Sequence, residues 1–378
     1  MNGRIVRLRD FDVLLLVAAL GLVALGTLLI YSGSLSQFGR PAASDFSHPV
    51  VRQVTFATIG VLLALVFARL DYRLLGTFSY GLYIAIIAML VFVDVAGEAA
   101  YGSRRWILIG GTQVQPSEIA KLVVIIMLAK YLSDRQESMN SLRTFAGSIA
   151  IVALPGAMVF AQPDLGSSLV FAAIWLGMVV VAGANWKHIF GLIGAGLVAV
   201  PFVFLGLVSD YQRERIHLWL DPERDPLGAG FQALQARIGI GSGGVFGKGL
   251  THGTQTQLDY LRTQTTDYIF SVLGEELGFL GAMVLFLLFA LLLWRGLRAA
   301  ELSRDMFGRL LATGIVASIL LQTFINVGVN VGLLPVTGIP LPFVSQGGSS
   351  LITLFIALGI LQSILLRHRP FTFRNLYS

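Results

Sequence analysis

The sequence predicts an all-α, polytopic membrane protein with about ten transmembrane helices and a large extracytoplasmic loop between helices seven and eight. Of its 378 residues, 55% are hydrophobic and only 13% are charged, and the mean hydropathy is +0.77. A soluble domain has about a quarter of its residues charged. The apolar residues also gather in runs of about 17–25 residues, which are long enough to cross a bilayer as helices.

Ten apolar runs form the expected helices. No small-residue cleavage site follows the first run, so we expect a retained anchor and not a removed signal peptide. The polar stretch 209–267 forms the large loop, residues 367–378 form a tail, and residues 1–378 are treated as a single membrane domain. The runs cover residues 13–31, 50–69, 75–95, 116–132, 145–162, 166–183, 187–208, 268–294, 307–330 and 346–366.

Positive charge predicts the orientation of the helices. With the N-terminus inside, 16 Lys and Arg residues lie on inner segments and 4 lie in the short outer loops. Cytoplasmic segments carry such an excess. We therefore expect both termini to be cytoplasmic and the loop 209–267 to be extracytoplasmic. Within this loop, Ile216–Ile240 mixes apolar and charged residues, as a short amphipathic helix on the membrane surface does.

Several classes of function are excluded by composition and motifs. The chain has no cysteine, which excludes disulfides and thiolate metal sites. Its net charge of +6 lies between apolar runs without a basic block, so no nucleic-acid partner is expected. No HExxH pattern identifies a zinc site. The stretch Gly239–Gly249 only superficially resembles a phosphate-binding loop, because Ser242 replaces its first glycine, and a flexible or close-packed loop is expected.

Asp267 is the leading candidate for a functional residue. It precedes an apolar run from Tyr268 to Trp294 that only Glu275 and Glu276 interrupt. Ionisable residues at membrane depth are costly and are usually functional. The alternative is that Asp267 only caps the N-terminus of the helix.

Other polar residues gather at the predicted outer ends of helices. Glu118 and Lys121 share one helix face, where a structural ion pair and a substrate contact are both plausible. Asp164 lies in a tight turn, and Arg105 precedes Trp106, so a turn role and an interfacial anchor are the alternatives. The predicted outer vestibule comprises Arg105, Glu118, Lys121, Asp164, Asp267, Asn330 and Ser345, with Glu275 deeper. A carboxylate base beside cations suits attack by a hydroxyl on a lipid-linked, phosphate-activated donor.

Ordered motifs over residues 10–368 resemble the SEDS family (shape, elongation, division and sporulation). They read QPSEIAKL at 115–122, QPDLGSS at 162–168, GSGGVFGKGLTHGTQTQLDYL at 241–261, TTDYIFSVLGEELG at 265–278 and NVGVNVGLLPVTGIPLPFVSQGGSSL at 326–351. The motif HGTQTQL within the third of these stretches is similar to that of the elongation branch of the family.

The resemblance implies a peptidoglycan glycosyltransferase that polymerises lipid II at the outer face of the bacterial inner membrane during cell elongation. It implies Asp267 as the general base, and Arg105 and Lys121 are the expected contacts of the lipid diphosphate. The implied partners are a class B penicillin-binding protein, which supplies transpeptidation, and other membrane proteins of the elongation complex. A divalent cation, magnesium or manganese, stays open, with no ligands identified. A lipid II flippase and a non-catalytic scaffold are the alternatives. Confinement of the polar residues to the outer half favours the enzyme.

Overall fold

The fold is seen in a computed structural model that describes residues 11–42, 45–96, 98–100, 103–109, 112–206, 210–225, 228–258, 260–261 and 263–368. Most of the predicted C-terminal tail, residues 369–378, lies outside the described residues. The α-helices are α1 Val13–Phe38, α2 Pro49–Arg69, α3 Arg73–Ala96, α4 Pro116–Asp134, α5 Leu142–Ala161, α6 Leu165–Val181, α7 Trp186–Gly206, α8 Asp210–Leu220, α9 Ala229–Gly243, α10 Thr254–Gln257, α11 Ile269–Leu302, α12 Met306–Asn330 and α13 Gly348–Leu366. Two 3₁₀ turns lie between helices: η2 Gln136–Ser138 between α4 and α5, and η3 Pro222–Arg224 between α8 and α9.

Each of the ten predicted membrane runs coincides with one helix, α1 to α7 or α11 to α13. Among the described residues, seven helices are long and apolar enough to cross a membrane. The apolar parts of α6 and α7 are shorter, and α4 carries Glu118, Lys121 and Lys130 within its length. The helical, polytopic fold is thereby confirmed, while the number of crossings stays a prediction.

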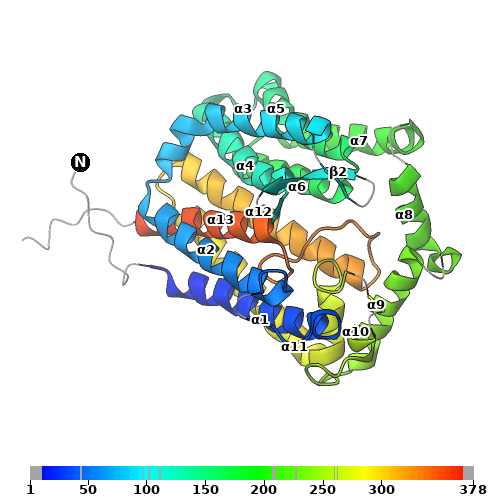
Figure 1. Ribbon diagram of the computed structural model, residues 1–378. Coiled ribbons are helices and arrows are strands. Elements are labelled where there is room, and N and C mark those ends of the chain that lie inside the picture. The colour runs from blue at the N-terminus through cyan, green and yellow to red at the C-terminus, as the bar shows by residue number, and fades with distance from the viewer. Residues whose placement is uncertain are drawn as a thin grey trace, which may run out of the picture.

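The core of the bundle is formed by α4, α12 and α13, whose side chains are mostly buried. Helix α2 packs along α13, α1 along α11, α3 along α4, and α6 along α12. Helices α8 to α10 and strand β2 gather at one end of the bundle, whereas α1 begins and α13 ends at the opposite end (Figure 1). The most polar segments of the chain therefore share one end of an otherwise apolar bundle.

A small sheet between α3 and α4 was not predicted. Strands β1 Glu98–Ala100, β2 Ser103–Ile109 and β3 Thr112–Val114 form an antiparallel sheet in the order β1-β2-β3. Ile107 pairs with Val114 in it. β-Branched and aromatic residues favour strands, but strands this short leave no clear alternation in a sequence dominated by long apolar runs.

Helix α11 differs from the regular helix expected over 268–294. It continues to Leu302, beyond the apolar run, and Arg295 in this extension pairs with Asp12. It is also broken at Gly278, where φ is +63°. A left-handed φ favours glycine, which has no Cβ to clash with the backbone. The break lets the glycine-rich stretch pack back on α11, with the Lys248 N–H donating to the Glu275 carbonyl at 3.0 Å. Residues 244–249 are therefore the close-packed loop that was expected, whereas residues 239–243 belong to the end of α9 and not to a loop.

The loop 209–267 is largely helical. The single amphipathic helix expected over Ile216–Ile240 is replaced by two helices, α8 and α9, with η3 between them. Pro222 begins η3, and a proline has no N–H to continue a preceding helix. Helix α9 packs against α11, so the loop lies directly over the segment that carries Asp267.

Candidate active site

The Asp267 carboxyl lies just before α11 but does not cap it. The N-cap residue of α11 is Tyr268, and no side chain caps the helix. The Asp267 backbone N–H donates to the Thr263 carbonyl at 3.1 Å, which closes a tight turn. The Asp267 side chain is half-buried, and among the described residues it makes no hydrogen bond or ion pair. Its carboxylate oxygens are therefore available to a ligand.

Two asparagines of α12 hold the backbone at Asp267. The amide of Asn330 donates to the Asp267 carbonyl at 2.8 Å, and the amide of Asn326 donates to the same oxygen at 3.1 Å. The Asn330 Oδ1 atom accepts the backbone N–H of Ser271 at 3.0 Å and its hydroxyl at 2.7 Å. The predicted site residue Asn330 thus positions Asp267 from the buried side.

A second clamp comes from the segment before α13. The hydroxyl of Ser345 donates to the Thr266 carbonyl at 2.6 Å and accepts the Leu341 N–H at 2.8 Å. The N–H of Gln346 donates to the Thr265 carbonyl at 2.9 Å. Ser345, also predicted from the sequence, therefore acts on the turn that carries Asp267.

A cavity of about 340 Å³ opens beside Asp267. Its charged lining residues in the described chain are Asp267, Arg215 of α8 and Arg237 of α9, and Trp219 and Val336 form part of its apolar wall. The sequence reasoning missed both arginines, because they lie in no motif and a long loop gives no spacing rule. Small-molecule sites are typically concave, mostly apolar and supplied with a few polar groups.

Burial changes the acidity of the Asp267 carboxyl. Desolvation raises the pKa of Asp267 from 3.8 to about 6; the positive charge of Arg215 lowers it, and the negative charge of Asp164 raises it. A general base works best when its pKa lies near the operating pH. The environment of Asp267 therefore suits a base that is ionised at neutral pH and still able to hold a proton.

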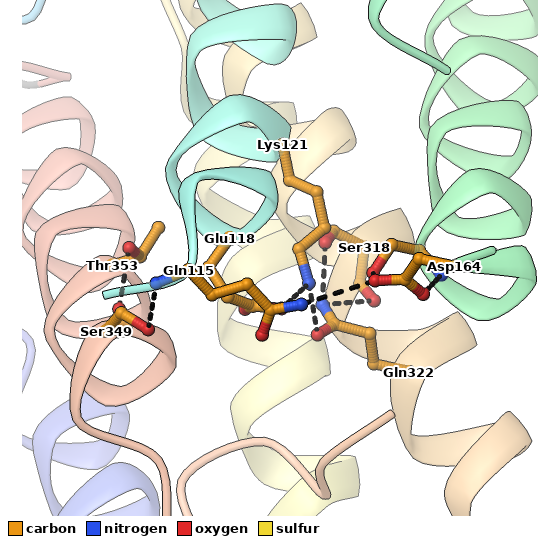
Figure 2. A network of polar contacts seen from close by, with 9 residues as sticks. Gln115, Glu118, Lys121, Asp164, Ser318, Gln322, Ser349 and Thr353 are labelled. Atoms are coloured by element: carbon orange, nitrogen blue, oxygen red, sulfur yellow. Dashed lines mark hydrogen bonds and ion pairs between the residues drawn. The ribbon is translucent and has the colours of Figure 1, made fainter. Parts of the chain in front are cut away.

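A second polar cluster lies inside the bundle between α4 and α12 (Figure 2). The Lys121 ammonium contacts Glu118 Oε1 at 2.7 Å and Gln322 Oε1 at 2.9 Å, and the two charged side chains are only 5% and 4% exposed. Gln322 in turn donates to the Ser318 hydroxyl at 2.8 Å. The predicted pair of Glu118 and Lys121 thus exists, and its charges are compensated inside the protein.

Asp164 and Arg105 organise the turn between α5 and α6. The Asp164 carboxylate accepts the Ser167 N–H and hydroxyl, both at 3.0 Å, and so caps α6. Gln115 donates to the same carboxylate at 3.3 Å, which joins this turn to the start of α4 (Figure 2). The Arg105 guanidinium donates to the carbonyls of Gln162, at 2.6 Å, and of Pro163. Asp164 still reaches Asp267 electrostatically.

Glu275 is held in a separate nest formed by the glycine-rich loop. Its carboxylate pairs with the Lys248 ammonium at 2.8 Å and accepts the N–H of Gln255 at 3.0 Å and the hydroxyl of Thr256 at 3.0 Å. Glu275 is buried and is absent from the described lining of the Asp267 cavity. The structure therefore does not bring it together with Asp267.

The described residues form no ready-made site of several protein ligands for a divalent cation. In the part of the chain that the structure describes, no three His, Cys, Asp or Glu side chains are grouped to hold a metal ion.

Comparison with known proteins identifies the family. A family model described as FTSW_RODA_SPOVE, cell cycle protein, matches residues 12–369. The chain belongs to this family. FTSW_RODA_SPOVE relatives include the peptidoglycan glycosyltransferase MrdB of Escherichia coli K12, which is 39% identical over 93% of this chain and 93% of its own. The stage V sporulation protein E of Bacillus subtilis is 40% identical over 93% of this chain and 96% of its own.

Two solved structures share the fold of this chain. The rod shape determining protein RodA of Thermus thermophilus superposes with a TM-score of 0.69 at 30% identity, over 97% of this chain and 98% of its own. A chain from a peptidoglycan synthase complex, described as coordinating polymerization and crosslinking, superposes with a TM-score of 0.76 at 35% identity, over 94% of this chain and 97% of its own.

Proposed function

We propose that the chain, a peptidoglycan glycosyltransferase of this family, polymerises lipid II with Asp267 as its general base. One observation carries the assignment of the base. A half-buried carboxyl without a partner among the described residues lies in a cavity beside two arginines, and the backbone on its buried side is clamped by Asn330 and Ser345. A structural carboxylate would instead be paired or would cap a helix.

The chemistry follows from the position of this base. The 4-hydroxyl of the GlcNAc on one lipid II attacks the anomeric carbon of the second, forming a C–O bond with inversion. The bond from that carbon to the diphosphate breaks, and its electron pair stays on the diphosphate oxygen. Asp267 takes the hydroxyl proton, which contributes about 10²–10⁴-fold to the rate. Holding both lipids in line lowers the barrier further.

The other predicted site residues support this centre in different ways. Asn330 and Ser345 position the Asp267 turn. Glu118 and Lys121 join α4 to α12 through Gln322. Asp164 caps α6 and contacts Gln115, and Arg105 holds the turn between α5 and α6. Glu275 fixes the loop that covers α11. Each of these assignments rests on the hydrogen bonds described above, and none requires direct contact with a sugar.

The protein is a multi-pass membrane protein, and we place it in the bacterial inner membrane with both termini cytoplasmic and the Asp267 cavity outside. The excess of Lys and Arg on the inner segments supports this orientation. We place a class B penicillin-binding protein beside it, because a structurally similar chain belongs to a complex that couples polymerization to crosslinking.

Purified wild type and Asp267→Asn should be compared in the polymerisation of lipid II, with and without the transpeptidase partner. The Asn variant keeps the shape of the side chain and removes its basicity, so glycan strands should disappear while the protein stays folded and still binds its partner. Near-normal polymerisation by Asp267→Asn would exclude Asp267 as the base. Lipid II transport without polymer formation by wild type would instead support a flippase.

A further inference from the structure

Arg237 places a positive charge at the cavity of Asp267. Its side chain is partly buried, and its Nε atom is fully buried without a hydrogen-bond acceptor among the residues described. A buried donor without a partner costs free energy, more so when it is charged. Arg237 lines the cavity, so a ligand entering there can accept hydrogen bonds from its guanidinium.

The backbone around Gly332 makes room for this arginine. Gly332 has a φ of +80°, and a Cβ built on it would lie 2.2 Å from the Arg237 Nε atom. The indole N–H of Trp219 donates to the Gly332 carbonyl at 3.0 Å, which fixes the same turn from α8. The guanidinium of Arg237 thus rests directly on a glycine that cannot be replaced without displacing it.

Arg215 brings a second guanidinium to the same cavity from α8. Its Nη1 atom donates to the Val336 carbonyl at 2.8 Å, which anchors the side chain to the segment after α12. Arg215 also lowers the pKa of Asp267, so its positive charge reaches the carboxyl electrostatically. Among the described lining residues, two cations therefore share the cavity with one carboxylate, and this balance of charge favours an anionic ligand.

The sequence favoured Lys121 and Arg105 as the cations that bind the lipid diphosphate, but both already have partners within the protein. The Lys121 ammonium is buried against Glu118 and Gln322, and the Arg105 guanidinium donates to two backbone carbonyls. Neither residue is among the described lining residues of the Asp267 cavity. A guanidinium is also better suited than an ammonium to bidentate contact with phosphate.

We propose that Arg215 and Arg237 form the anion subsite of the Asp267 cavity and bind the diphosphate of the lipid-linked donor. This assignment rests on the proposed glycosyl transfer. As the bond from the anomeric carbon to oxygen breaks, its electron pair moves onto the diphosphate, and both guanidinium groups stay protonated and donate hydrogen bonds to it. Donors placed where charge develops stabilise the transition state.

Binding without turnover tests the subsite. The probe is undecaprenyl diphosphate, which carries neither sugar nor peptide, added to detergent-purified Asp267→Asn protein. Arg215→Gln and Arg237→Gln should each weaken binding about ten- to a hundredfold, the range for losing a charged hydrogen bond. Arg237→Lys, which keeps the charge, should recover part of the affinity. Arg224→Gln is the matched control, because Arg224 is exposed in η3 and pairs with Asp221, outside the described lining of the cavity.

The outcomes separate the subsite from the rest of the mechanism. Unchanged affinity of the double variant Arg215→Gln/Arg237→Gln for undecaprenyl diphosphate would overturn the proposal, provided its thermal unfolding midpoint matches that of the control. The proposal would also be overturned if the double variant lost affinity for complete lipid II but kept its affinity for undecaprenyl diphosphate. The arginines would then bind the carboxylates of the peptide and not the diphosphate. Because no reaction is measured, a failure of Asp267 as the base leaves this test intact.

Discussion

Polymerisation should fall as the pH drops through about 6, because the base must be ionised to accept a proton. Desolvation raises the pKa of Asp267 to about 6 from an ordinary 3.8. The raised pKa means that protonation begins at mildly acid pH. Activity is therefore fully present above about pH 7 and is lost below about pH 6, whereas an unperturbed aspartate would support it down to about pH 4.

The size of the effect follows from the two pKa values. At pH 5 a carboxyl of pKa about 6 is roughly 9% ionised, whereas one of pKa 3.8 would be roughly 94% ionised. The rate at pH 5 should thus be about a tenth of the plateau rate. Desolvation is the largest cause of the shift in the pKa of Asp267; the positive charge of Arg215 from α8 lowers this pKa, and the negative charge of Asp164 at the start of α6 raises it.

The assay is single-turnover polymerisation of saturating lipid II by the detergent-purified protein between pH 4.5 and 8. Two variants test the electrostatics in opposite directions. Arg215→Gln removes a charge that lowers the pKa, so the midpoint should move to higher pH. Asp164→Asn removes a charge that raises it, so the midpoint should move to lower pH, and asparagine still caps α6 well.

Thermal unfolding midpoints measured at each pH separate titration from loss of the fold. A rate that stays within twofold of the plateau down to pH 5 would refute the reasoning, since the titrating base would then have an ordinary pKa. Identical midpoints for wild type, Arg215→Gln and Asp164→Asn would show that the titrating group is not Asp267.

Three further predictions concern stability. Asp267→Asn should stabilise the fold by about 1–3 kcal/mol at pH 8 and should have no effect near pH 3. The pKa of Asp267 is higher in the folded than in the unfolded protein, so the ionised carboxylate destabilises the fold only at a pH above its pKa in the unfolded chain. Thermal unfolding at both pH values tests the sign of this effect. Asn330→Ala should cost about 1–3 kcal/mol and slow polymerisation, since the Asp267 carbonyl loses a buried donor, and an unchanged unfolding midpoint would contradict it. Lys121→Met should destabilise by about 3–5 kcal/mol by leaving Glu118 buried and unpaired, and adding Glu118→Leu should restore much of the loss in the same unfolding assay.

The sequence alone determined the helical membrane fold. A helix that crosses a bilayer needs a long apolar run, and such runs are easily recognised in the sequence. It also predicted the pair of Glu118 and Lys121, since residues three apart in a helix lie on one face. Asp267 could also be recognised from the sequence, because it is a charged residue directly before a long apolar run. The small sheet was missed, because its signal is weak beside those runs.

Only the tertiary structure decided what surrounds Asp267. Its carbonyl is held by Asn330, which lies 63 residues away in the chain, and Ser345 reaches Thr266 across 79 residues. Arg215 and Arg237 come from two helices of a loop whose spacing predicts nothing about where their side chains end. The break at Gly278 likewise turns the glycine-rich loop onto Glu275 and away from Asp267. Such contacts depend on how distant segments pack, and local periodicity carries no information about that packing.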